Sequence, residues 1–279
     1  MSFRLDRFEM KFVITREQRN AMMPRLLERM RADENALEGA YYPIVSVYYD
    51  NADRDCYWEK EQKVPSRRKM RVRIYGNDDG RLPPTIFVEI KHKCDGRGVK
   101  RRLKVSLDEA YWISAGNDPR VPLRPVDQRS VFEIHDLVRV RKFKPCLAMR
   151  YDREAFADKD PESDLRVTFD TGIAYRFNEF EARPDDRKFS DYLLPPGYSV
   201  LEVKVTGSVP YWMTRLVGEV GCILQSHSKY NNALEAGDVL LHEQMGGRPY
   251  KPHYGLTPDS LPSRSNSNAV ADPPVAVAV

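Results

Sequence analysis

A short run of the sequence, RKMRVRIYG at residues 68–76, alternates strictly between cationic and apolar side chains. Neighbouring side chains of a strand point to opposite faces, so Lys69, Arg71 and Arg73 would share one face. Arginine makes forked hydrogen bonds to phosphate oxygens, and lysine adds a compact positive charge. This face could therefore bind a phosphate-rich anion, or it could be the solvated side of an ordinary antiparallel sheet.

Three other segments place a glutamate two residues before a lysine, which again sets both side chains on one face of a strand. The segments are FEMKF, VEIKHK and LEVKV, with the pairs Glu9 and Lys11, Glu89 and Lys91, and Glu202 and Lys204. The residues of the opposite face are apolar, as with Val88 and Ile90. On a solvated surface such acids and bases would pair with one another and contribute little to stability.

The amphipathic helices of the chain favour a different arrangement, because they need an apolar surface to cover. If they pack outside the sheet against residues such as Met70, Val72 and Leu201, the charged faces must converge inward. Burying unpaired charge is costly, so such an interior would be wet and filled by a compact polyanion such as a triphosphate or polyphosphate. A divalent cation held by the glutamates would then bridge to phosphate oxygens. Alternation alone leaves both arrangements open.

About eight segments show the alternation or the β-branched composition of strands. They are residues 4–14, 43–50, 68–76, 85–93, 99–107, 145–156, 165–177 and 198–205. Helices are expected after the capping box TREQ at Thr15, with a kink or early break at Pro24, and near residues 53–60, 107–115, 126–140, 210 and 228. This order predicts an α+β fold whose antiparallel sheet could close into a barrel, with the helices packed outside.

Composition limits the classes of function. The chain has 279 residues, with 45 Lys and Arg against 41 Asp and Glu, a balance that argues against a nucleic-acid partner. The four cysteines lie far apart, which indicates a reduced, cytoplasmic protein without a zinc knuckle. No run approaches the ~20 apolar residues of a membrane helix, so we expect no membrane segment.

Residues 246–279 are rich in Pro, Ser and Ala and are expected to form a flexible tail after a domain of residues 1–245.

The order of the motifs resembles that of a known family. RFEMKF, SVYYDNADRDCY, RKMRVRIYG, VEIKHK, VKRRLKVSLDEA, YDREAF, RVTFDT, LEVKV and SKYNNAL follow one another as in the VTC domain. That domain is the polyphosphate polymerase module of the vacuolar transporter chaperone proteins, in the CYTH or triphosphate tunnel metalloenzyme superfamily. The resemblance implies an eight-stranded antiparallel β-barrel tunnel and transfer of the γ-phosphoryl group of ATP to a growing polyphosphate chain, with Mn²⁺ or Mg²⁺ as cofactor.

The resemblance also implies roles for individual residues. Catalysis in the tunnel would depend on Lys11, Arg71, Arg73, Lys91, Arg153 and Arg166. Substrate phosphates would be bound by Lys100, Arg102 and Lys229, with Lys69 and Lys204 near the tunnel mouth. The metal would be held by Glu202, supported by Glu9 and Glu89. Arg150 has the opposite parity from Arg153, so only one of the two should face inward.

Three alternatives stay open. In a triphosphatase on the same barrel, water would attack, oriented by Glu9 or Glu89. A non-catalytic module would bind polyphosphate or nucleotide only. An RNA-binding barrel is disfavoured, because aromatic side chains should then be interleaved with the cations, and the cationic face of RKMRVRIYG has none before Tyr75. The resemblance of the YDREAF and SKY motifs to the VTC domain favours the polymerase over the triphosphatase, because simple triphosphatases of the superfamily match less of the chain.

Overall fold

The computed structural model describes residues 7–33, 41–76, 85–94 and 97–237. Eight strands form one antiparallel sheet, in the order β1 (Arg7–Ile14), β10 (Ser199–Thr206), β8 (Arg166–Arg176), β7 (Lys144–Asp158), β3 (Tyr42–Asp50), β4 (Ser66–Tyr75), β5 (Thr85–Cys94) and β6 (Arg97–Lys104). Two short strands, β2 (Met30–Ala32) and β9 (Asp191–Tyr192), pair with β7 and β8 and were not expected from the sequence. The predicted domain end near residue 245 and the tail lie outside the described residues.

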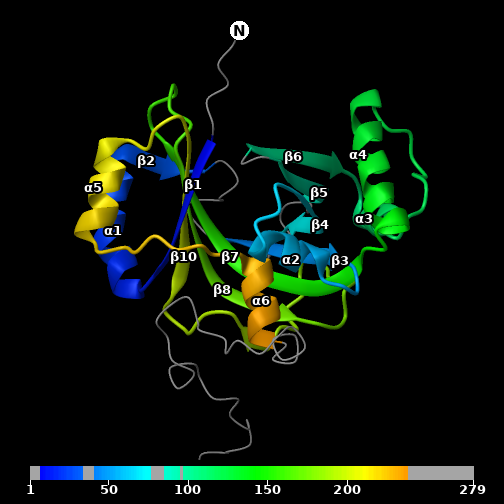
Figure 1. Ribbon diagram of the computed structural model, residues 1–279. Helices are drawn as coiled ribbons and strands as arrows, with labels where there is room; N and C mark the ends of the chain where they lie inside the picture. The colour runs from blue at the N-terminus through cyan, green and yellow to red at the C-terminus, as the bar shows by residue number, and fades with distance from the viewer. Residues whose placement is uncertain (1–6, 34–40, 77–84, 95–96, 238–279) are drawn as a thin grey trace, which may run out of the picture.

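The sheet curls into a half-barrel, which brings its first strand toward its far side (Figure 1). Glu9 on β1 and Lys91 on β5 meet across this curl, with Glu9 Oε2 3.5 Å from Lys91 Nζ. The expected antiparallel architecture of eight strands with helices outside is confirmed. Among the described residues, backbone pairing ends at β1 and β6, and the contact between Glu9 and Lys91 joins β1 to β5.

Two groups of helices cover the outer face of the sheet (Figure 1). The first is α1 (Arg16–Arg29) with α5 (Tyr211–Glu219), and the second is α3 (Leu107–Ser114) with α4 (Pro125–His135) and the π-helical turn η2 (Asp136–Val140). Met22, Leu26 and Leu216 of the first group belong to one apolar cluster with Leu201 and Val203 of the sheet.

The second group of helices packs in the same way. Ile113 and Ile134 join a cluster that contains Met70, Val72 and Leu103, all of them fully buried. The apolar residues of RKMRVRIYG therefore face the helices, and its cations face the concave side. All nine residues of β3 are buried, as expected of a central strand covered on both faces.

Helix α1 begins as its sequence predicts. The Gln18 backbone N–H donates to Thr15 Oγ1 while the Thr15 N–H donates to Gln18 Oε1, which completes the capping box. The expectation of an early break at Pro24 is wrong, because the helix runs on to Arg29. Met22 and Leu26 on either side of the proline are fully buried, and this packing offsets the lost hydrogen bond.

Helix α6 (Lys229–Gly237) packs against one end of the sheet beside α2 (Asp55–Glu61) (Figure 1). Tyr57 OH on α2 donates to Glu235 Oε1 at 3.2 Å. The Tyr230 hydroxyl donates to Asp50 Oδ2 at 2.5 Å, and its ring centroid lies 5.5 Å from that of Tyr48. The start of α6 is thereby fixed at the concave side. Within the described ranges, every helix is too short or too polar to cross a membrane.

Truncating an apolar side chain on the outer face of β6 should destabilise the protein more than truncating the next side chain along the strand, which points to the other face. We expect Leu103→Ala to lower the free energy of unfolding by about 2–5 kcal/mol, because it leaves a cavity beneath α4. Lys104→Ala removes an exposed side chain and should change it by less than about 0.5 kcal/mol. Urea unfolding of both variants checks this, and equal losses would contradict the assignment of the two faces.

Candidate functional site

Strand register brings the charged residues of the concave face into rows. Directly paired residues of neighbouring strands point to the same side of a sheet. One row therefore contains Tyr48, Arg71, Glu89 and Arg102 from four successive strands. The next contains Lys69, Lys91 and Lys100. On the other side of the curl, Lys11, Glu202 and Thr168 form a third row.

The first group of charges surrounds Glu89, and we call it the Glu89 cluster. Glu89 Oε2 accepts from Arg71 Nε at 2.8 Å and lies 3.9 Å from Arg73 Nε. Its Oε1 contacts Lys100 Nζ at 2.6 Å and Arg102 Nε at 2.9 Å. Burial would raise the pKa of Glu89, but Arg71, Arg73 and Lys100 outweigh it and hold the pKa below its ordinary value. One buried carboxylate thus holds four cations together.

The second group, the Glu202 cluster, comprises Glu202 and Asp170 with Lys11, Arg153, Lys204 and Lys229. Arg153 donates to both oxygens of Asp170, at 2.6 and 2.7 Å. Lys229 Nζ lies 2.6 Å from Asp170 Oδ2 and 3.1 Å from Glu202 Oε1. Burial would lower the pKa of Lys229, but these two carboxylates raise it above its ordinary value.

Glu9 connects the Glu202 cluster with β5. Its carboxylate lies 3.4 Å from Lys11 Nζ, 3.5 Å from Lys204 Nζ and 3.5 Å from Lys91 Nζ. Burial would raise the pKa of Glu9, but the three lysines lower it to about 2. Glu9 therefore stays ionised at neutral pH on the face where Glu202 also lies.

Tyr151 lies between the two clusters, and sequence reasoning did not select it. Its hydroxyl accepts from Arg73 Nη2 at 2.8 Å, and its ring centroid lies 5.0 Å from Lys229 Nζ and 5.4 Å from Arg153 Cζ. Asp170 was also missed as a site residue. Both could have been found by parity, because Tyr151 lies two residues before Arg153, and Asp170 shares a strand face with Arg166.

The concave face gathers most of the residues selected from the sequence. The two clusters and the Glu9 contacts contain Glu9, Lys11, Arg71, Arg73, Glu89, Lys91, Lys100, Arg102, Arg153, Glu202, Lys204 and Lys229. Arg153 points inward, whereas Arg150 pairs in register with Val45 on the outer face.

Two of the selected cations lie apart from the clusters. Lys69 Nζ donates to Asn231 Oδ1 at 2.7 Å, and burial lowers its pKa to about 8. Arg166 forms an ion pair with Asp33 and donates to Tyr42 OH at 3.5 Å. Lys69 thus contacts α6, and Arg166 contacts the chain just after β2.

The oxygen donors for a divalent cation are limited. Within the described ranges, no three His, Cys, Asp or Glu side chains form a group that could hold a metal ion. Glu9 and Glu202 share the ammonium groups of Lys11 and Lys204, so their carboxylates lie near each other. Mg²⁺-type ions are commonly bound by one or two carboxylates plus substrate phosphates, and this pair fits that pattern.

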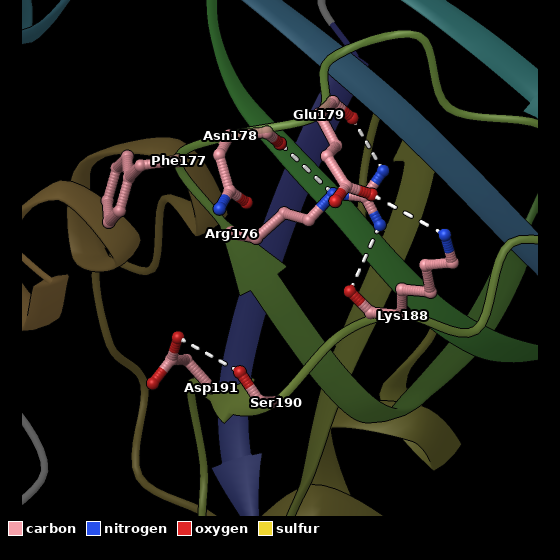
Figure 2. Close-up of a pocket in the computed structure, with 7 residues that line it drawn as sticks. All are labelled: Arg176, Phe177, Asn178, Glu179, Lys188, Ser190 and Asp191. Atoms are coloured by element: carbon pink, nitrogen blue, oxygen red, sulfur yellow. Dashed lines mark hydrogen bonds and ion pairs between the residues drawn. The ribbon is translucent and has the colours of Figure 1, made fainter.

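A cavity of about 420 Å³ beside β8 is a different feature (Figure 2). Arg176 lines it and uses all five of its N–H donors: on both oxygens of Asp186 and on the backbone carbonyls of Asn178, Glu179 and Lys188. The guanidinium therefore holds together the segment that follows β8, and no donor is left for a ligand.

The fold is a curled antiparallel sheet whose concave face carries two clusters of cations around buried carboxylates. The family model of the VTC domain matches residues 6–236, and the chain belongs to this family. Vacuolar transporter chaperone complex subunit 4 of Schizosaccharomyces pombe is 24% identical over 243 residues, which cover 74% of this chain and 33% of that protein. The chain thus matches about a third of the length of that relative.

Two solved structures match the chain at lower similarity. A candidate adenylate cyclase from Bacillus halodurans is 10% identical with a TM-score of 0.46, and the match covers 84% of this chain and 97% of that one. Another from Vibrio parahaemolyticus is 8% identical with a TM-score of 0.43, covering 82% and 97%.

Removal of the buried Asp170 carboxylate should destabilise the protein. In Asp170→Asn, Arg153 loses its nearest charged partner and Lys229 loses one of two, so we expect the free energy of unfolding at pH 7 to fall by about 3–5 kcal/mol. The matched control, Asp118→Asn, breaks an exposed pair with Arg139 and should cost less than about 1 kcal/mol. Urea unfolding measures both, and a loss as small as the control's would refute the structural role of Asp170.

Proposed function

We propose that this protein is a metal-dependent polyphosphate polymerase that transfers the γ-phosphoryl group of ATP to the end of a growing polyphosphate chain. The observation that carries the proposal is the pair of adjoining cationic clusters on the concave face of a VTC domain. Two clusters joined through Tyr151 suit a ligand with several phosphates in a row better than a single anion.

The chemistry requires positioning and charge neutralisation more than covalent participation by the protein. Arg71, Arg73 and Arg102 would orient phosphate oxygens through forked hydrogen bonds, while Lys11 and Lys229 would neutralise charge on the neighbouring phosphate. The terminal phosphate of the acceptor chain is already ionised at neutral pH. Its oxygen can attack the γ-phosphorus of ATP without a general base, while the bond to the β,γ-bridging oxygen breaks and ADP leaves.

A divalent cation, Mn²⁺ or Mg²⁺, is part of the proposal. Glu202 would hold it with Glu9 in support, and phosphate oxygens would complete its coordination. When bound, the ion neutralises charge on the phosphates during transfer. Glu202 is better suited to hold it than Glu89, because Glu202 shares the ammonium groups of Lys11 and Lys204 with a second carboxylate, that of Glu9.

The main alternative is a triphosphatase on the same face. The Glu9 side chain is 30% exposed, whereas that of Glu89 is 2% exposed, so Glu9 is accessible to a water that it could orient. A module that binds polyphosphate without catalysis would use the same cations. The cytoplasmic location and the lack of a nucleic-acid partner stay predictions.

One assay separates these functions. The purified protein is incubated with ATP and Mn²⁺, and polyphosphate is followed on a gel beside released phosphate. Growing chains with little free phosphate are the expected result. Free phosphate alone would replace the polymerase by a triphosphatase, and neither product would leave a binding module.

A pair of arginine variants ties the activity to the concave face. Arg71→Ala should lower the rate of ATP consumption at least about 100-fold, because it removes a charged donor aimed at the phosphates. Arg101→Ala, on the outer face beside Glu133, is the matched control and should retain most activity. Similar losses in both variants, with intact folding by circular dichroism, would exclude the concave face as the site.

The metal assignment can be checked by binding alone. Glu202→Gln keeps the size of the side chain but removes its charge, and should weaken Mn²⁺ binding to the tripolyphosphate complex about tenfold or more. Electron paramagnetic resonance of free Mn²⁺ measures this affinity. Glu154→Gln, a buried carboxylate paired with Arg19 near α1, is the control. Unchanged Mn²⁺ affinity in Glu202→Gln would exclude Glu202 as a ligand.

A further inference from the structure

We propose that Glu89 is an internal counterion that occupies the place of a phosphate and makes the site select phosphate chains over single phosphate ions. This inference rests on the proposed binding of phosphate chains to the concave face. It assigns Glu89 a role in specificity rather than in holding metal.

The contacts of Glu89 are those that a bound phosphate would make. Its Oε2 is contacted by Arg71 through both Nε and Nη2, at 2.8 and 2.6 Å. Its Oε1 is shared by Lys100 and Arg102. Forked guanidinium groups and ammonium groups are the donors that bind phosphate oxygens in proteins, and here the carboxylate already uses them.

The Glu89 carboxylate is shielded from solvent. Glu89 is 1% exposed and sits in register between Arg71 and Arg102 on the strands at either side. Its charge is therefore hardly screened, and an anion that enters the cluster must either share the four cations with Glu89 or separate it from them. Separating a buried ion from its partners costs several kcal/mol.

Repulsion by Glu89 weakens the binding of short anions more than that of long ones. A single phosphate can contact only one cluster, so all of its binding energy is set against repulsion by Glu89. A chain of three or more phosphates also reaches Tyr151 and the lysines of the Glu202 cluster, and the added contacts offset that repulsion. Glu89 thus raises the minimum charge and length of a ligand.

The competing explanation is that Glu89 only holds mutually repelling cations in place. The two roles predict opposite changes in phosphate affinity when the charge of Glu89 is removed. If Glu89 competes with ligand anions, removing its charge strengthens the binding of a single phosphate. If Glu89 only organises the cations, the same change scatters them and weakens the binding of every anion.

The test compares wild type and Glu89→Gln by calorimetric titration with orthophosphate and with tripolyphosphate, in metal-free buffer. We expect orthophosphate to bind the variant at least about tenfold more tightly, because one charged competitor for the arginine donors is gone. The ratio of tripolyphosphate to orthophosphate affinity should fall by a similar factor. The control is Glu133→Gln, which loses a carboxylate paired with Arg101 on the outer face and should keep both affinities.

A double variant tests whether tighter phosphate binding comes from removal of the Glu89 carboxylate itself or only from the change in the net charge of the cluster. Glu89→Gln with Lys100→Met removes one negative and one positive charge, so the formal charge of the cluster is that of wild type. Orthophosphate should still bind more tightly than to wild type. The double variant also limits the repulsion among the cations, and therefore gives a result if the single variant does not fold.

The outcomes are distinct. Unchanged or weaker orthophosphate binding in Glu89→Gln, or in the double variant, overturns the inference and leaves the proposed function intact. Failure of wild type to bind tripolyphosphate in metal-free buffer also overturns the inference, whereas the proposed function, which includes Mn²⁺, is decided by the ATP assay described above. Tighter orthophosphate binding in both variants, with the control unchanged, supports the counterion role.

Discussion

The electrostatic balance of the concave face is the constraint on which the rest of the structure depends. Cations on several strands are turned toward one another, and like charges in a partly buried space repel strongly. The carboxylates of Glu9, Glu89, Asp170 and Glu202 are placed among them, each in contact with two or more cations. These acids compensate part of the positive charge that the curl of the sheet brings together.

Burial on both faces follows from the same constraint. The concave side is taken by charge, so the apolar side chains of the sheet are left for the helices, and the two helix groups cover them from outside. The strands near the centre consequently have no solvated face, as β3 illustrates. The outer apolar clusters supply hydrophobic stabilisation, and the inner ion pairs set the direction in which each strand faces.

Much of this arrangement could be predicted from the sequence. Period-two alternation identified the cationic side of β4 and of its neighbours, because parity along a strand is a local property. Parity does not reveal which residues meet across a curl. The contact between Glu9 and Lys91, and the pairing of Arg166 with Asp33 away from the clusters, depend on tertiary distances. The run of α1 through Pro24 likewise depends on packing that propensity does not contain.

The late position of α6 in the chain affects the order in which the parts of the fold assemble. Lys229 belongs to the same cluster as Lys11, although 218 positions separate them in the chain. During synthesis, Asp170 and Glu202 leave the ribosome before the lysine that joins them does. Asp170 therefore lacks one of its two cationic partners until the last described helix docks. Because contacts so distant in sequence form late, the site is expected to be among the final parts of the molecule to acquire its native geometry.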